Sequence, residues 1–229
     1  AAVAAGVDWA VAQGADVISM SLGSPDPSAD IRRALQRAVA AGKFVVCAAG
    51  NDGRPDSVGY PAAWDELAVA VGAIGPDGKL ANFSSRGRQV DVCAPGVNVL
   101  SSWPGSRYAK LSGTSMATPY VAGCLALVRG ELKKRGLPIP SQSEIEKLSR
   151  ETAKDLGSPG FDTDTGFGLI QPVKLLERLL AGAPVPPPPV TPPTPPQPNP
   201  GPGGYTGTVT TVTKWDRGAF QGQTVAYNP

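Results

Sequence analysis

Residues 17–48, VISMSLGSPDPSADIRRALQRAVAAGKFVVCA, decide the fold of this chain. The apolar runs at 17–22 and 43–48 are typical of buried strands. Between them, Ser28 or Asp30 can cap a helix that runs to Ala41, and Gly42 can end it. A third apolar run lies at 67–71. Buried strands that alternate with helices predict an α/β fold with a mostly parallel sheet covered on both faces.

The flanking sequence extends this pattern. An alanine-rich segment at 1–13 predicts a helix, and residues 73–110 carry Gly and Pro between short strands, with a hairpin around 103–105. Further helices are expected at 114–135, at 143–150 with Glu144 and Glu146 in the first turn, and at 172–180. The compact domain is therefore expected to span residues 1–181.

Two segments of different composition follow this domain. Residues 182–204 carry most of the prolines and are expected to form an extended linker. Residues 205–229 alternate Thr and Val from Thr208 to Thr213, which predicts the start of a β-rich accessory module too short to fold alone. Because the first residues also lack the features of a signal peptide, we expect the chain to be part of a longer protein.

Charge and hydropathy argue against two kinds of partner. Lys and Arg total 21 and Asp and Glu total 19, which gives a net charge of +2 without a basic stripe, so no nucleic-acid partner is expected. No apolar run is long enough to span a membrane. Three cysteines, Cys47, Cys93 and Cys124, lie among small apolar residues, which favours buried thiols over a disulfide or a zinc site.

Three segments are expected to meet at one edge of the sheet. Ligands bind at the carboxyl ends of the strands in an open parallel sheet, where Ser21-Leu22-Gly23 and Ala49-Gly50-Asn51 are predicted to lie. The Asn51 amide can donate to a developing oxyanion. The third segment, SGTSMATP at 112–119, leads into the long helix, whose free amides favour an anion beside Ser115. Taken alone, Ser115 or Thr114 can equally be an ordinary N-cap.

Together the segments resemble a known family. GTSMATP at 113–119 resembles the nucleophile motif of the subtilisin-like serine peptidases (subtilases, peptidase family S8). AAGN at 48–51 resembles their oxyanion-hole segment, and SMSLG at 19–23 resembles their substrate-binding strand. Three further motifs match in the family's order: GYPA at 59–62, FSSRG at 83–87 and APG at 94–96. The resemblance covers residues 1–180 and implies the family's three-layer α/β sandwich with a mostly parallel sheet, here incomplete at its N-terminal side.

The resemblance implies a role for each matching residue. Ser115 matches the nucleophile and Asn51 the side-chain oxyanion donor, with the Ser115 amide as the second donor. Ser21, Leu22 and Gly23 match the strand that pairs with an extended polypeptide substrate. Four small residues match the pocket that holds the substrate side chain on the N-terminal side of the cleaved bond, and they leave room for a large apolar group. These residues are Ala48, Ala49, Gly50 and Gly59. Tyr60-Pro61 matches a position where the family commonly has a cis peptide.

The chain departs from the family pattern at its catalytic base. The family order is Asp, His, Asn and Ser, yet the sequence contains no histidine, and neither Asp8 nor Asp16 has the family's surrounding motif. The resemblance therefore implies the C-terminal portion of a catalytic domain, without the catalytic Asp and His and inactive on its own. Members often bind calcium, and Asp65 and Glu66 are available, although a solvated loop explains two acids better. No cofactor is required and no metal ligand is assigned.

Two functions remain open at this stage. The first is a serine endopeptidase that hydrolyses peptide bonds through an acyl-enzyme on Ser115. The second is a non-catalytic relative that binds peptides or serves as a structural module in a secreted multidomain protein. Retention of both Asn51 and Ser115 favours the first, because an oxyanion donor has no evident use in a binding module. In either case we expect a polypeptide partner, a monomer and an extracellular location.

Overall fold

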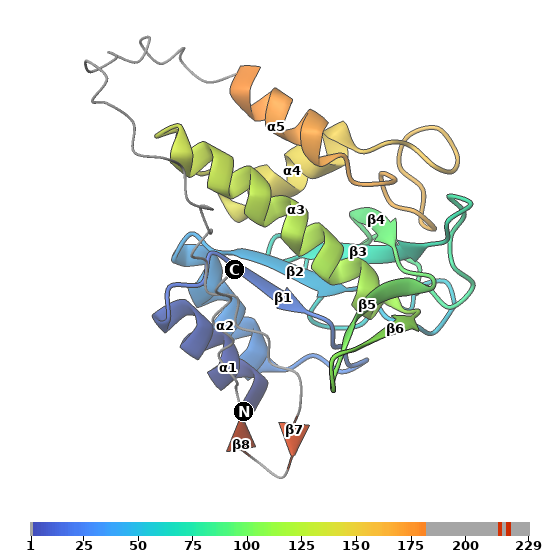
Figure 1. The fold of residues 1–229 in the computed structure, drawn as a ribbon, viewed down its shortest axis with the longest axis horizontal. Coiled ribbons are helices and arrows are strands. Elements are labelled where there is room, and N and C mark those ends of the chain that lie inside the picture. Colours follow the sequence, from blue (N-terminus) through green and yellow to red (C-terminus); the bar gives the residue numbers. More distant parts are fainter. Residues whose placement is uncertain (1, 182–214, 217–218, 221–229) are drawn as a thin grey trace. The chain divides into compact units, whose positions relative to one another are not determined.

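The computed structural model describes residues 2–181, 215–216 and 219–220 of the 229-residue chain (Figure 1). These residues belong to two units, which are described separately. The linker predicted at 182–204 and the Thr/Val strand predicted at 208–213 lie outside the described residues. Of the predicted accessory module, the structure describes two short antiparallel strands, β7 (Trp215–Asp216) and β8 (Ala219–Phe220).

A four-stranded parallel sheet organises the first unit. Its strands lie in sequence order: β1 (Val17–Met20), β2 (Phe44–Ala48), β3 (Val69–Ile74) and β4 (Val92–Pro95). Every residue of β2 and β3 is buried, as expected for strands covered on both faces. The third strand begins two residues later than the apolar run at 67–71 predicted, because Leu67 and Ala68 pack at the end of the preceding loop.

Helices cover both faces of this sheet and make a three-layer sandwich (Figure 1). On one face lie α1 (Ala2–Ala12) and α2 (Ala29–Ala40), and on the other lies the long helix α3 (Thr114–Lys134), which contacts all four strands. Two further helices, α4 (Gln142–Thr152) and α5 (Pro172–Ala181), pack against each other, and α5 also contacts α3. The predicted α/β class is confirmed.

Strand residues alternate between two apolar cores. Phe44, Val46 and Val71 face the cluster that includes α3, whereas Val45 and Cys47 face the cluster that includes α1 and α2. This alternation follows from the two-residue period of a strand. The four strands therefore need apolar residues at nearly every position, and the apolar runs within residues 17–48 have this composition.

Local signals account for several element boundaries. Ser28 is the N-cap of α2, and its side chain accepts a hydrogen bond from the Ile31 amide, so Ser28 rather than Asp30 begins this helix. Helix α4 begins with a capping box between Ser141 and Glu144. The prediction that Glu144 lies in the first turn is confirmed, whereas the same prediction for Glu146 is wrong, because α4 already begins at Gln142 and Glu146 lies beyond the first turn, only 3% exposed.

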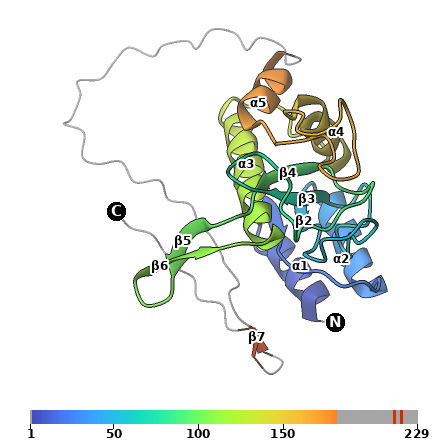
Figure 2. The ribbon, with the colours of Figure 1, turned by 90° about the vertical axis from the view of Figure 1, so that its right-hand side faces the viewer.

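Other sequence predictions for this unit are confirmed. The hairpin is formed by β5 (Val99–Trp103) and β6 (Arg107–Leu111), and it projects from the rest of the unit (Figure 2). The three cysteines are buried free thiols, and burial raises the pKa of Cys93 to about 12, which keeps it protonated. The Tyr60-Pro61 peptide is cis. None of the helices in the described ranges is both long and apolar enough to cross a membrane.

Candidate active site

The loops that follow β1 and β2 meet the first turn of α3 at the carboxyl edge of the sheet. They enclose a cavity of about 590 Å³, a size that suits a peptide side chain and its neighbours. Eight of the nine predicted site residues line it: Ser21, Leu22, Gly23, Ala48, Gly50, Asn51, Gly59 and Ser115. Segments separated by 94 positions in the chain therefore form one site, as the parallel topology requires.

The ninth predicted residue, Ala49, does not line the cavity. It is fully buried, and its carbonyl accepts a hydrogen bond from the Gly59 amide at 3.0 Å. The side chains of consecutive residues in an extended segment point to opposite sides, so Ala49 faces the interior when its neighbours face the cavity. Ala49 instead holds the Gly59 loop beside β2 and lies behind the residues that line the cavity.

Ser115 lies in the first turn of α3, and it is not the helix cap. The N-cap is Gly113, and no side chain makes a capping hydrogen bond there. The alternative in which Ser115 or Thr114 is an ordinary N-cap is therefore wrong. Amides in the first turn of a helix have no intrahelical acceptor, so the Ser115 N–H is available to a ligand. The positive end of the helix dipole also favours negative charge at this position.

Asn51 is held by Thr114, the residue next to Ser115. The backbone N–H and the Oγ1 hydroxyl of Thr114 both donate to Asn51 Oδ1, each at 2.9 Å. A backbone N–H can only donate, so the atom it meets must be the amide oxygen, and Nδ2 is the atom left for a ligand. Thr114 is fully buried, and its side chain is fixed by this contact. Sequence reasoning treated Thr114 only as a possible cap and missed this role.

The two candidate oxyanion donors lie around a common space beside Gly113. A Cβ placed on Gly113 would lie 3.6 Å from Ser115 N and 3.7 Å from Asn51 Nδ2. Gly113 has φ of +155° and no side chain, so this space is open to a substrate atom. Two N–H donors around one open position are the arrangement that stabilises the oxyanion of a tetrahedral intermediate.

The Ser115 hydroxyl has no strong partner within the described residues. Its Oγ lies 3.5 Å from the Ser21 carbonyl oxygen, at the long limit of a hydrogen bond. Neither candidate acid is near it. Asp8 pairs with Arg37 at 2.7 Å, and the hydrogen bond from Arg37 lowers the pKa of that carboxyl. Asp16 precedes β1, at the opposite end of the strand from Ser21, and pairs with Lys133 and Arg129.

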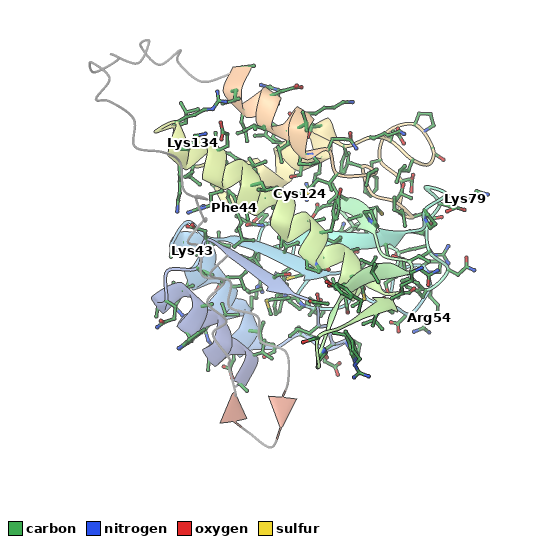
Figure 3. The ribbon with its side chains drawn as sticks, in the orientation of Figure 1. Lys43, Phe44, Arg54, Lys79, Cys124 and Lys134 are labelled. Carbon is green, nitrogen blue, oxygen red and sulfur yellow. The ribbon has the colours of Figure 1, made fainter. Side chains whose placement is uncertain are left out.

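The cavity combines a floor of small residues with a charged rim. Ala48, Gly50 and Gly59 form part of the lining, and the loop between them adds Asp52, Arg54 and Asp56. Arg54 lies 4.0 Å from Asp52, and both side chains are largely exposed. Figure 3 places Arg54 at the end of the sheet opposite Lys43, which precedes β2. Sequence analysis did not predict this rim, because charged loop residues are normally solvated.

A calcium site near Asp65 and Glu66 does not fit the residues present. Both are exposed, and within residues 2–181, 215–216 and 219–220 no three His, Cys, Asp or Glu side chains gather where they could hold a metal ion. Calcium takes six to eight oxygen ligands, usually with several carboxylates. No step of the chemistry below is therefore assigned to a metal.

The fold and the site define the class of protein. A serine in the first turn of a helix, beside an asparagine amide at the carboxyl edge of a parallel sheet, is the nucleophile and oxyanion arrangement of a serine hydrolase. A sequence model of the subtilase family matches residues 1–168. The chain belongs to the subtilase family of serine peptidases.

Individual relatives agree with this assignment. The chain is similar to subtilisin BL of Lederbergia lenta, with 46% identity over 168 residues that make up 73% of this chain and 59% of that protein. It is also similar to the major intracellular serine protease of Bacillus subtilis (strain 168), with 42% identity over 166 residues, 68% of this chain and 52% of that protein. Among solved structures, the prenylagaramide maturation protease PagA superposes with a TM-score of 0.70 at 27% identity, over 77% of this chain and 66% of that chain. The chain spans between about half and three fifths of the length of these curated relatives.

Proposed function

We propose that the protein to which this chain belongs is a serine endopeptidase with Ser115 as its nucleophile. The observation that carries the proposal is the placement of Asn51 Nδ2 and the Ser115 N–H around one open position beside Gly113. Ser115 Oγ attacks the scissile carbonyl and gives up its proton to a general base. The carbonyl oxygen becomes an oxyanion that the two N–H groups stabilise. The C–N bond then breaks, the amine leaves with the proton, and water hydrolyses the acyl-enzyme.

The general base and its aspartate belong, in this proposal, to sequence outside these 229 residues. The chain has no histidine, and among the residues that the structure describes the Ser115 hydroxyl makes only the long contact to the Ser21 carbonyl. On its own the chain is therefore expected to be inactive. An extended polypeptide would bind beside Ser21, Leu22 and Gly23, which are exposed next to the cavity. Leu22 is 42% exposed and offers an apolar contact for a substrate side chain.

The test is labelling of the full-length gene product by a fluorophosphonate probe, with the Ser115→Ala variant as the matched control. We expect labelling of the full-length protein at Ser115, none in the variant, and no appreciable labelling of residues 1–229 alone. Hydrolysis of a peptide should parallel the labelling. A full-length protein that binds peptides without being labelled would instead support the second candidate, a non-catalytic peptide-binding relative.

The composition of the chain after the peptidase domain bears on the compartment. The Pro-rich segment after residue 181 suits an exported multidomain protein, so we propose a secreted location. The relatives include both subtilisins and a protein named as an intracellular serine protease. Fractionation of the source cells and their medium, with an antibody against the chain, distinguishes the two locations.

A further inference from the structure

Ser115 occupies a helix position whose carbonyl lacks its usual donor. In an α-helix the carbonyl of a residue accepts from the N–H four positions later. Four positions after Ser115 is Pro119, inside α3, which has no N–H and whose ring crowds that same carbonyl. The Thr114 carbonyl, one residue earlier, accepts from the Thr118 hydroxyl at 2.8 Å. The backbone of the nucleophile is therefore less constrained by its own helix than that of its neighbour.

The residue that directly follows β1, Ser21, supplies the missing donor. Ser21 Oγ donates to the Ser115 carbonyl oxygen at 2.9 Å, a good hydrogen-bond distance. A second, longer contact joins the same two residues: Ser115 Oγ lies 3.5 Å from the Ser21 carbonyl oxygen. The hydroxyl of Ser21 thus ties the end of the edge strand to the first turn of α3, next to the nucleophile.

We infer that the Ser21 side chain is a positioning residue for the nucleophile, in addition to any contact that its backbone makes with substrate. It fixes the Ser115 peptide unit in the turn where Pro119 removes the helical hydrogen bond. The Ser115 Cα bonds directly to that carbonyl carbon and also carries the Cβ–Oγ group and the N–H, so the contact restrains the direction of the nucleophile and of one oxyanion donor. This inference rests on the proposed function, because positioning has a kinetic meaning only if Ser115 reacts.

The first test is Ser21→Ala in the full-length protein. The substitution keeps the backbone that would pair with substrate, so KM should change little. The rate constant kcat, counted per fluorophosphonate-titrated site, should fall roughly three- to tenfold, the effect of one neutral hydrogen bond. Ser21→Thr keeps a hydroxyl on the same atom and should restore most of kcat.

Ser28→Ala is the matched structural control. It also removes one serine hydroxyl, but at the N-cap of α2 and outside the site. It should lower the thermal midpoint and leave kcat per titrated site unchanged. If Ser21→Ala behaves in the same way, its role is structural and the inference is wrong.

A second substitution tests the part played by Pro119. Pro119→Ala gives residue 119 an N–H that can donate to the Ser115 carbonyl within the helix. In this background Ser21→Ala should cost clearly less in kcat than it does in the wild-type background. An equal cost in both backgrounds would contradict the inferred link between Ser21 and the proline.

Hydrogen exchange tests the contact between Ser21 and Ser115 even if the full-length protein is inactive. Exchange of the amides within residues 112–120 should be faster in Ser21→Ala than in the wild type and unchanged in Ser28→Ala. An inactive protein with this exchange pattern would overturn the proposed function but not the contact. Unchanged exchange in Ser21→Ala would overturn the inference whatever the activity.

Discussion

Thr114 and Asn51 form a two-point contact in which one side-chain oxygen accepts both hydrogen bonds. Asn51 Oδ1 receives the Thr114 N–H and the Thr114 hydroxyl, each at 2.9 Å. An amide held at its oxygen by two donors cannot rotate without breaking both, so Nδ2 keeps a fixed direction. This contact prepares the oxyanion donor before substrate arrives, which is the condition under which such a donor is effective.

Removal of one of these two donors should weaken catalysis without abolishing it. Thr114→Val keeps the shape and the backbone N–H but deletes the hydroxyl, so Asn51 is held at one point only. We expect kcat of the full-length protein to fall by about fivefold, near the net value of one hydrogen bond. Thr114→Ser retains the hydroxyl and should stay close to wild type in steady-state kinetics. An unchanged kcat in the Val variant would mean that the backbone N–H alone orients Asn51.

Removal of the amide itself should have a larger effect. Asn51→Ala deletes Nδ2 and leaves Ser115 N–H as the only donor of the pair. Loss of one oxyanion donor costs about a hundred- to a thousandfold in kcat, a magnitude that comes from a subtilisin and therefore from a relative of this chain. KM for a peptide substrate should change little, because the donor acts on the transition state. A large rise in KM with constant kcat would assign Asn51 to substrate binding instead.

The sequence predicted the sheet and the central site residues well because their signals are local. The strand ends that carry Ser21 and Asn51 follow apolar runs, and the helix that carries Ser115 begins at a glycine. A parallel sheet brings such strand ends together without further information. Six motifs in family order then removed most of the ambiguity about which serine is the nucleophile.

The features that sequence reasoning missed depend on how elements distant in the sequence pack against each other. Glu146 was expected in the first turn of a helix, yet it lies beyond the first turn of α4 and is buried, on the helix face where Gln142 bonds to the Val45 backbone. Ala49 was expected to line the cavity, but the pleat of the strand turns it inward. Such contacts depend on which elements pack together, and no spacing within the chain reveals them.

Gly50 should not tolerate a side chain. Its φ is +116°, and a Cβ there would lie 2.8 Å from Ser85 Oγ, which itself accepts the Asp52 amide. Gly50→Ala therefore combines an unfavourable backbone conformation with a steric clash beside the cavity. We expect a loss of at least about 1 kcal/mol in the free energy of unfolding, measured by urea denaturation. Gly123→Ala, on α3 with no atom within 4 Å of the added Cβ, is the matched control and should not be destabilised.

A buried polar network lies beneath α4. Gln142 bonds to the Val45 backbone and donates to Glu146 at 2.7 Å, and Arg150 pairs with Asp91. Two buried carboxyl groups thus share one guanidinium. Burial raises the pKa of Asp91 to about 6 and that of Glu146 to about 7.

These shifts set the direction of the pH dependence of stability. A buried acid with a raised pKa holds its proton more tightly in the folded state than in the unfolded state. The protonated carboxyl contributes its full stabilisation at pH values below the pKa that the group has in the unfolded state, near 4.5 for Glu146. This stabilisation is lost as the pH rises through the pKa of the folded state, about 7. A rise from 4.5 to about 7 corresponds to a loss of roughly 3 kcal/mol in the free energy of unfolding.

Glu146→Gln should therefore flatten the stability profile between pH 5 and pH 8. The amide keeps an oxygen that can accept from Gln142 but does not ionise, so the loss that the wild type suffers at higher pH is removed. Urea denaturation across this pH range measures the difference between the two proteins. Glu151→Gln, an exposed position on the same helix, should leave the wild-type slope intact. If Glu146→Gln keeps that slope as well, Glu146 is not the group whose ionisation destabilises the fold, and Asp91 becomes the group to substitute.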